Sequence, residues 1–262
     1  MKVLITEMPK KIATFKEFHG NLVEKFDDNP KSSANTFDLG DYLPASQFHI
    51  HKNNLEGKLP ESQEKAIRGY SRESHKTNNW LHKINDDPSS LGPKSQPIFK
   101  KHHKEKIFKI DEAFANKKNH VGIDHEVFTG LPESPEKVFK KDRENNPNHD
   151  PAHVHVHLPA FTSTSTDLNI AKNFSDPSSN NLSNHYVYHV LHIRVPKDHP
   201  SMSIKSLSKH KREDEVLLHR GTRLKIHATP FEERHETRGF TKTYKIWHAD
   251  VVGHKPDDLE TK

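Results

Sequence analysis

Two glutamates, Glu213 and Glu215, stand two residues apart and are followed by the apolar run Val216, Leu217 and Leu218. If this run is a strand, residues i and i+2 point to the same face, so the two carboxylates lie side by side. Adjacent carboxylates in a sheet repel each other unless a cation or a hydroxyl lies between them. The pair therefore indicates either a site for a cationic or hydroxylated group, or simply a solvated start of a strand.

A second segment, Phe161-Thr162-Ser163-Thr164-Ser165, is dense in hydroxyls and leads into a short helix expected at residues 167–174. The hydroxyls and the amides at the helix N-terminus are good partners for a phosphate or a carboxamide. Serine and threonine also cap helices for structural reasons alone. The segment by itself leaves both interpretations open.

Histidine is unusually abundant, with 23 residues in the chain. His153, His155 and His157 alternate with valines, which would place three imidazoles on one face of a strand that can bind a transition metal. We favour the alternative of an edge strand with a polar outer face, because no nearby set of carboxylates completes a metal site.

The remaining pattern predicts helices first and short strands afterwards. Apolar residues at helical spacing predict helices at residues 12–26, 61–84 and 105–116, with a loop at 27–35 and a break at 86–97. Strands are expected at residues 126–129, 160–163, 186–195, 215–218, 224–227 and 243–252, with an exposed polar excursion at 133–151. The predicted fold class is α+β with a mainly antiparallel sheet.

Composition limits the function classes. Of the 262 residues, 31% are hydrophobic and 29% charged, with a mean hydropathy of −0.97, so we expect a modest core, mostly in the second half. The net charge of +5 is too small to identify a nucleic-acid binder. The absence of cysteine excludes disulfides, zinc thiolates and cysteine nucleophiles. No stretch is suitable for a signal peptide or a membrane span, so a soluble protein is expected.

Together, in this order and spacing, the two segments resemble the arginine-specific mono-ADP-ribosyltransferases, whose fold is a split β-sandwich around an NAD cleft. The family's aromatic-x-Ser-Thr-Ser motif matches residues 161–165, and its Glu-x-Glu motif, followed by an apolar run and Arg-Gly-Thr, matches residues 213–222. Residues 64–81 resemble the helix that precedes the cleft, so the resemblance covers about residues 61–252. It implies an N-terminal appendage at 1–60, a catalytic domain at 61–255 and a polar tail at 256–262.

The resemblance implies transfer of ADP-ribose from NAD to an arginine side chain, with release of nicotinamide. Glu215 is then the catalytic carboxylate, which hydrogen-bonds the ribose and stabilises the oxocarbenium-like transition state. Ser163 is expected to orient Glu215. Glu213 is expected to position or deprotonate the incoming guanidinium, whose free pKa is above about 12. NAD is the expected co-substrate, and no metal is required.

The residues expected to contact NAD lie on the two core strands and on the preceding helix. They are Phe128, Thr129, Gly130, Phe161, Thr164, Ser165 and Arg68. The family usually carries an arginine where this sequence has Thr129, and a guanidinium is the better phosphate partner. Arg68 or Arg72 is expected to supply the missing cation.

Within the family, residues 127–132 and 158–165 are most similar to phage transferases that modify host RNA polymerase. This implies a host protein substrate such as RNA polymerase, in the host cytoplasm, and no membrane partner. The loop at residues 201–212 is expected to face the protein substrate. The competing interpretations are a transferase fold that has lost turnover and acts as a binding module, an NAD hydrolase, an enzyme that modifies nucleic acid, and a polar α+β domain with chance motifs. The oligomeric state stays open.

Overall fold

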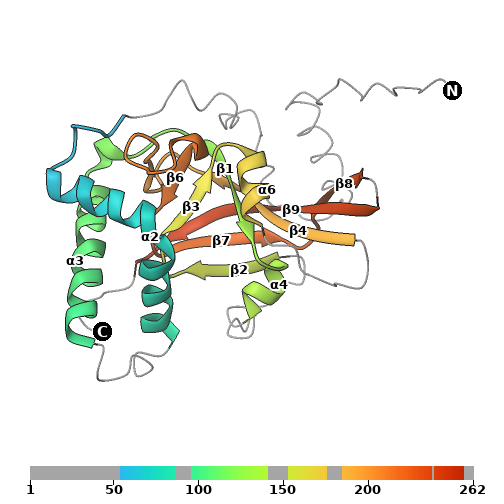
Figure 1. The fold of residues 1–262 in the computed structure, drawn as a ribbon, viewed down its shortest axis with the longest axis horizontal. Helices are drawn as coiled ribbons and strands as arrows, with labels where there is room; N and C mark the ends of the chain where they lie inside the picture. The colour runs from blue at the N-terminus through green and yellow to red at the C-terminus, as the bar shows by residue number, and fades with distance from the viewer. Residues whose placement is uncertain (1–53, 87–95, 141–152, 176–184, 238, 257–262) are drawn as a thin grey trace. The chain divides into compact units, whose positions relative to one another are not determined.

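Figure 1 shows the computed structural model, which describes residues 54–86, 96–140, 153–175, 185–237 and 239–256. The helix expected at residues 12–26 and the loop at 27–35 lie outside the described residues. Two helices come first, α2 (Glu61–Asp86) and α3 (Gln96–Ala115), and they pack against each other. We expected α3 to begin at residue 105. It begins instead at Gln96, and Pro97 is tolerated in its first turn because an N–H at that position has no helical partner in any case.

Nine strands and several short helices form the rest of the described chain. The strands are β1 (His125–Leu131), β2 (His153–Leu158), β3 (Thr162–Ser165), β4 (His185–Val195), β5 (Ser201–Ser203), β6 (Glu215–Leu218), β7 (Thr222–His227), β8 (Phe231–Thr237) and β9 (Phe240–His254). The short helices are η4 (Lys117–Asn119), α4 (Pro135–Val138), α6 (Leu168–Phe174) and η5 (Lys211–Glu213). No helix in the described ranges is long and apolar enough to cross a membrane.

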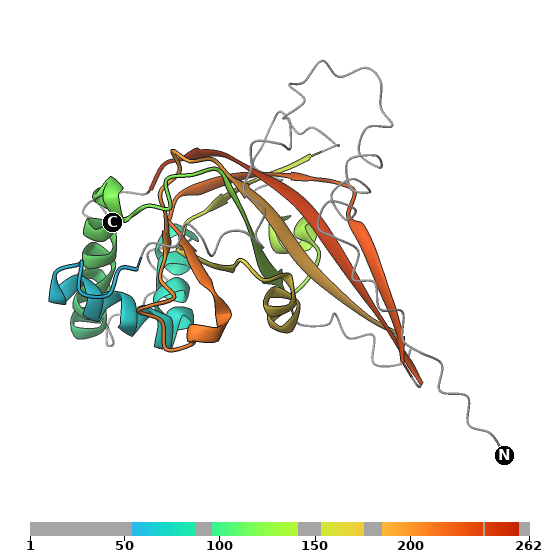
Figure 2. The same cartoon turned by 90° about the horizontal axis from the view of Figure 1, so that it is seen from above.

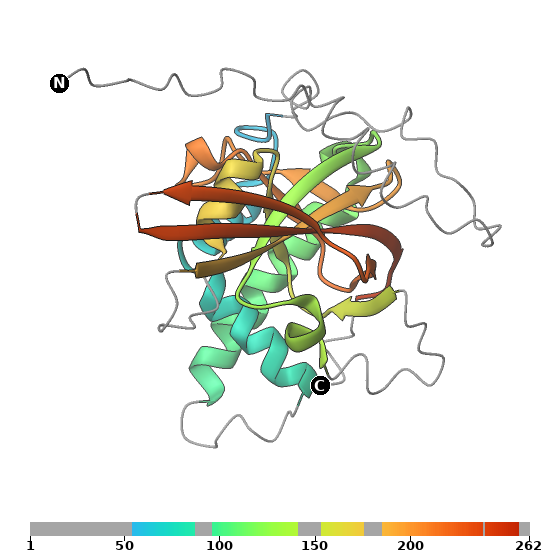
Figure 3. The same cartoon turned by 90° about the vertical axis from the view of Figure 1, so that its right-hand side faces the viewer.

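The strands run in the order β2-β7-β9-β4-β1-β3-β6-β5. β8 pairs with β9, and the two form the long red hairpin of Figure 3. Among the described strands, β4 and β9 form the one parallel pair, and the other pairs are antiparallel. β1 follows β4 along its whole length, but it meets β3 at the single pair Phe128–Ser165. The sheet is therefore divided between β1 and β3, and the predicted α+β class with a mainly antiparallel sheet is confirmed.

Two clusters of apolar side chains hold this arrangement together. The sheet core gathers side chains from both sides of the division: Val127, Leu131, Val154, Val156, Leu191, Ile193, Val195, Val216, Leu218, Leu224, Ile226, Trp247 and Ala249. The helix-side core joins α2 and α3 to the residues just before β3, to β5 and to β6. Figure 2 shows the two helices, in cyan and green, together at one side of the sheet. Leu55 and Leu59, which the sequence analysis placed in the N-terminal appendage, lie in this second cluster.

Each of the six strands expected from the sequence overlaps an observed strand, and residues 153–158 form the edge strand β2. The strands β5 and β8 were missed. β5 has three residues, which is too short for a periodic pattern. β8 pairs only with β9 and is mostly charged, so it carries no apolar alternation to detect.

Gly130 on β1 lies under the C-terminal end of α6. A Cβ atom added there would meet the backbone nitrogen of Ser175 at 2.5 Å and the carbonyl oxygen of Ala171 at 2.7 Å. Backbone atoms cannot rotate away as a side chain can, so α6 can approach the sheet this closely only over a glycine. Gly130, which the resemblance implies is a cofactor contact, therefore has a packing role in the structure: it allows α6 to lie against β1.

We expect Gly130→Ala to lower the free energy of unfolding by about 1–3 kcal/mol, because the added methyl group overpacks this contact. Urea denaturation measures the change. Gly69→Ala, in α2, is the matched control: its Cβ would lie 3.6 Å from the side chain of Lys106 on α3, which is an ordinary van der Waals contact. This control should be neutral or stabilising, since alanine favours helix over glycine. Equal losses in both variants would contradict the assignment.

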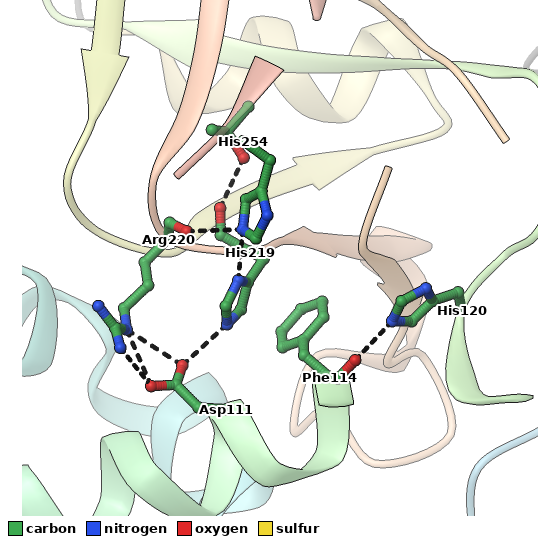
Figure 4. A network of polar contacts seen from close by, with 7 residues as sticks. Asp111, Phe114, His120, His219, Arg220 and His254 are labelled. Carbon is green, nitrogen blue, oxygen red and sulfur yellow. Dashed lines mark hydrogen bonds and ion pairs between the residues drawn. The ribbon is translucent and has the colours of Figure 1, made fainter. Parts of the chain in front are cut away.

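Figure 4 shows a polar network that fastens α3 to the turn after β6 and to the end of β9. Asp111 of α3 accepts hydrogen bonds from Arg220 Nε at 2.9 Å and Nη2 at 2.6 Å. Its other oxygen lies 2.9 Å from Nε2 of His219, whose Nδ1 is 2.6 Å from Nε2 of His254. Because His219 and Arg220 are buried, this network fixes the end of the strand that Glu215 begins.

Asp111→Asn should lower the free energy of unfolding by about 3 kcal/mol, because the buried guanidinium of Arg220 loses its countercharge. Thermal and urea unfolding measure the loss. Glu112→Gln removes the neighbouring carboxylate, which pairs with Lys109 at the surface, and should change stability little. A small effect of Asp111→Asn, similar to that of the control, would show that the network does not secure α3.

Candidate active site

Glu215 is the first residue of β6 and is 6% exposed. Burial raises the pKa of its carboxyl group, while hydrogen bonds from Ser163 and Ser208 act in the opposite direction. The nearby charge of Glu213 adds to the upward shift. Two hydroxyls thus stabilise the ionised form of a carboxyl group that burial disfavours. Ser163 and Glu213, the two residues expected to act with Glu215, both shift its pKa.

Glu213 does not lie on the strand with Glu215, as the sequence pattern predicted. It ends the 3₁₀ turn η5, and Asp214 between the two glutamates adopts a left-handed conformation with φ of +46°. Asp214 forms an ion pair with Lys205. The carboxylate of Glu213 is 27% exposed and lies 3.6 Å from Nδ1 of His210. One glutamate is therefore buried and the other faces outward, close enough for their charges to interact.

The hydroxyls of β3 hold β6 and the turn before it. The hydroxyl of Thr164 donates to the carbonyl of Val216 at 2.6 Å, and that of Ser165 donates to the carbonyl of Glu213 at 2.6 Å. Each of these hydroxyls gives its only proton to a carbonyl, so neither has a proton left for a cofactor. Thr164 and Ser165 act in the structure as positioning residues for the two glutamates.

The helix after the Ser-Thr segment is capped from within the chain. The side chain of Asp167 accepts a hydrogen bond from the amide of Asn169 at 2.8 Å at the start of α6. A negative charge already satisfies this helix N-terminus. The cap of α6 is therefore an aspartate and not one of the serines or threonines of the segment; Ser165 instead accepts a hydrogen bond from the amide of Asp167 at 3.0 Å.

Helix α2 reaches the site through Tyr70 and Asn78. Both donate to the carbonyl of Phe161, at 3.3 and 3.0 Å, and the tyrosine hydroxyl also lies 3.4 Å from the hydroxyl of Ser163. Tyr70 is fully buried, and burial raises the pKa of its phenol, to which the charge of Glu215 adds. The phenol is therefore a neutral donor that fixes β3 beside the buried carboxylate.

The same helix holds the segment that supplies the second hydroxyl. The hydroxyls of Ser71 and Ser208 are 2.8 Å apart, and the amide of Lys209 donates to Ser71 at 3.1 Å. The amide of His210 donates to Ser208 at 3.0 Å. Residues 201–203 of the loop expected at 201–212 form β5 instead, and the remainder is tied to α2 by these contacts.

The two aromatic residues expected to contact NAD are buried. Phe161 is 2% exposed and packs edge-on against Tyr70, with ring centroids 5.6 Å apart. Phe128 is 3% exposed and stacks on His192 at 4.8 Å. Both rings therefore belong to the interior of the protein.

Thr129 and Arg68 are also engaged within the protein. The Thr129 hydroxyl donates to the carbonyl of Ser163 at 3.1 Å, which bridges the two strands beside the division of the sheet. Arg68 pairs with Glu56 at 2.8 Å on the surface of α2. The structure thus brings Glu215, Ser163 and Glu213 together, while the Thr129 hydroxyl is used within the sheet and Nη2 of Arg68 is held by Glu56.

Comparison with known proteins decides the family. The family described as ADP-ribosyltransferase exoenzyme matches residues 48–246, which includes every residue of the site. The chain belongs to this family. Its members are transferases that use NAD as co-substrate for mono-ADP-ribosyl transfer, so the coarse part of the expected activity is confirmed.

Solved structures of other ADP-ribosyltransferases share the fold. The C3 exoenzyme of Clostridium limosum matches with a TM-score of 0.50 and 14% identity, over 81% of this chain and 98% of that one. C3stau2 from S. aureus, solved with NAD, gives 0.50 and 16%, over 82% and 97%. The enzymatic component C2-I of the Clostridium botulinum C2 toxin gives 0.52 and 16%, over 82% and 47%. No curated protein matches the chain in sequence.

Sequence reasoning missed the supporting residues of this ADP-ribosyltransferase site, namely Tyr70, Ser71, Asn78 and Ser208. The first three lie in the segment 64–81 that resembles the family helix, but the pattern gave them no individual role. Ser208 lies in a polar stretch with no periodicity. Only the fold shows that its hydroxyl reaches a carboxylate seven positions later in the sequence.

We expect Ser208→Ala to raise the pKa of Glu215, because it removes one of the two hydrogen bonds that favour the ionised form. Titration of the carboxyl carbon of Glu215 by NMR, in protein labelled at glutamate, measures this pKa. Ser206→Ala is the control, since its hydroxyl accepts a hydrogen bond from the amide of Leu55 instead. An unchanged titration in Ser208→Ala would rule out the contact.

Proposed function

We propose that this protein transfers ADP-ribose from NAD to an arginine of a target protein, with Glu215 as the catalytic carboxylate. The observation that carries the proposal is the buried carboxylate of Glu215, held by the hydroxyls of Ser163 and Ser208 beside the outward-facing Glu213. A pair of carboxylates in two different environments is suited to two different roles in one reaction.

The chemistry follows from the charge that forms in the transition state. When the bond between nicotinamide and C1′ of the ribose breaks, its electron pair leaves with nicotinamide and positive charge develops on the ribose. Glu215, ionised and hydrogen-bonded to a ribose hydroxyl, stabilises this charge more than it stabilises bound NAD. Ser163 keeps the carboxylate in place during this step.

Glu213 is suited to the second half of the reaction. Its carboxylate is partly exposed on the turn before β6, where a side chain of a target protein can approach. It accepts the proton that the guanidinium loses when one of its nitrogens bonds to C1′, because a protonated guanidinium is a poor nucleophile. Lysine would need the same help, so the acceptor has to be identified by experiment.

The diphosphate of NAD requires a cation, which Thr129 cannot supply and which Arg68 supplies only in competition with Glu56. We assign this role to Arg72, whose exposed side chain lies one turn after Arg68 on α2. A guanidinium can form two parallel hydrogen bonds to phosphate oxygens. The similarity of residues 127–132 and 158–165 to phage enzymes makes bacterial RNA polymerase the first target protein to test.

With labelled NAD, wild-type protein should label a band in a bacterial lysate or in purified RNA polymerase. Glu215→Gln should lower the rate at least about 100-fold, because the isosteric amide carries no charge to stabilise the oxocarbenium-like ribose. Glu213→Gln should still release nicotinamide but lose transfer to protein. The rate at which hydroxylamine releases the label, compared with that of an arginine-linked standard, and mass spectrometry of the modified peptide identify the acceptor.

Glu112→Gln, a surface change on α3, controls for handling, and circular dichroism checks that each variant is folded. Labelling that persists in Glu215→Gln would contradict the assigned carboxylate. Nicotinamide release without any labelled protein would support an NAD hydrolase. Absence of both, in folded wild-type protein, would favour a binding module.

A further inference from the structure

A row of imidazoles crosses one face of the sheet outside the candidate active site. The rings of His153, His227, His248 and His192 follow one another on β2, β7, β9 and β4, with centroids 4.9, 5.2 and 5.2 Å apart. The strand registers produce this row, since His153 pairs with His227 and His192 with His248. The function proposed above uses none of these side chains.

One carboxylate lies at the centre of this row. Asp250 is two residues after His248 on β9, so both side chains lie on the same face. Nε2 of His227 is 3.2 Å from Oδ2 of Asp250, and Nε2 of His248 is 3.6 Å from Oδ1. One ligand atom from each of the three residues can be chosen so that all three lie within 4.8 Å of one another.

These distances are close to those of a coordinated ion. Nitrogen and oxygen ligands of zinc lie about 2.0–2.2 Å from the metal, which places two tetrahedral ligands roughly 3.3–3.6 Å apart. The two imidazoles face different oxygens of Asp250, with His227 Nε2 3.2 Å from Oδ2 and His248 Nε2 3.6 Å from Oδ1. An ion between them would bind both oxygens, or one oxygen after a rotation of the imidazole that faces the other.

We propose that His227, His248 and Asp250 form a binding site for a divalent transition-metal ion of the zinc type. Two imidazoles and one carboxylate suit zinc, cobalt or nickel, whereas magnesium and calcium prefer sites made entirely of oxygen. The side chains are 27%, 12% and 21% exposed, in that order. This exposure provides an entry path and leaves a fourth position for water.

Arg194 prepares the carboxylate for this role. Its Nε donates to Oδ1 of Asp250 at 2.6 Å, which fixes the carboxylate and leaves Oδ2 directed toward His227. Hydrogen bonds from outside the ligand set commonly orient metal ligands in this way. The positive charge of the guanidinium weakens the attraction of the site for a cation, so we expect micromolar affinity, lower than that of a structural zinc site with four protein ligands.

The site is distinct from the candidate active site. Along the registered strands, His248 on β9 is followed by His192, Phe128, Ser165 and finally Glu215 on β6. Four strand spacings separate the ends of this row, about 19 Å along the sheet. The metal would therefore join β7 to β9 and would not take part in ADP-ribosyl transfer, so the proposal does not rest on the proposed function.

The test uses full-length protein without a histidine tag, freed of metal by a chelator and titrated with Zn²⁺ by calorimetry. We expect one ion per chain, a rise in Tm with added Zn²⁺, and tetrahedral absorption bands when Co²⁺ replaces Zn²⁺. His227→Gln should weaken binding at least about 10-fold and abolish these bands. Mg²⁺ should give no heat above that of dilution.

The control variant carries His155→Gln and His157→Gln, which remove the two other histidines of β2 and leave the proposed ligands intact. It should bind Zn²⁺ as the wild type does. Loss of binding in the control, or unchanged binding in His227→Gln, would place the ion on other histidines and overturn the proposal. Because His248→Gln affects a more buried side chain, it serves as a second variant, and its unfolding curve without metal shows whether the fold is retained. Absence of a saturable Zn²⁺ signal in the wild type would also overturn it.

Discussion

The burial of one carboxylate is the constraint around which the rest of the site is organised. An ionised carboxylate loses much of its hydration inside a protein, and only hydrogen bonds or countercharges offset that loss. Glu215 receives hydrogen bonds from Ser163 and Ser208, which stand on different segments of the chain. Helix α2 supports both segments, through Tyr70 beside Ser163 and through Ser71 beside Ser208. Removal of any of these supports would leave a buried charge with fewer partners.

The division of the sheet is what makes such a site available. A fully paired sheet would cover both edges of β3, whereas β1 and β3 meet at the single pair Phe128–Ser165. Beside this pair, the Thr129 hydroxyl takes the place of a further ladder bond by donating to the carbonyl of Ser163. The division therefore leaves Ser163 between two strands and a helix. Thr129 thereby helps to hold the two strands together at the division.

Much of the fold could be predicted from the local hydrophobic pattern of the sequence, but much of the candidate site could not. The apolar strands and α2 were predictable because hydrophobic period is a local property, and β5 and β8 were not, because one is too short and the other too polar. Glu215 and Ser163 were found through the spacing of two motifs. The separation of Glu213 from the strand depends on the left-handed Asp214, and the contact of Ser208 with Glu215 depends on tertiary packing. Neither leaves a periodic signal in the sequence.

The two kinds of buried titratable group respond to acid in opposite directions. Burial lowers the pKa of His125 to about 4 and that of His199 to about 3. The pKa of histidine in the unfolded chain is about 6.5. Below this pH the unfolded chain binds protons that the folded side chains do not bind, so the free energy of unfolding decreases as the pH falls toward 4. The pKa of Glu215 is raised, so its protonation in acid relieves the cost of burial while it removes the charge that catalysis needs. Acid therefore weakens the fold through the histidines and the proposed activity through the glutamate, and near-neutral pH is where a neutral imidazole interior and an ionised Glu215 coexist.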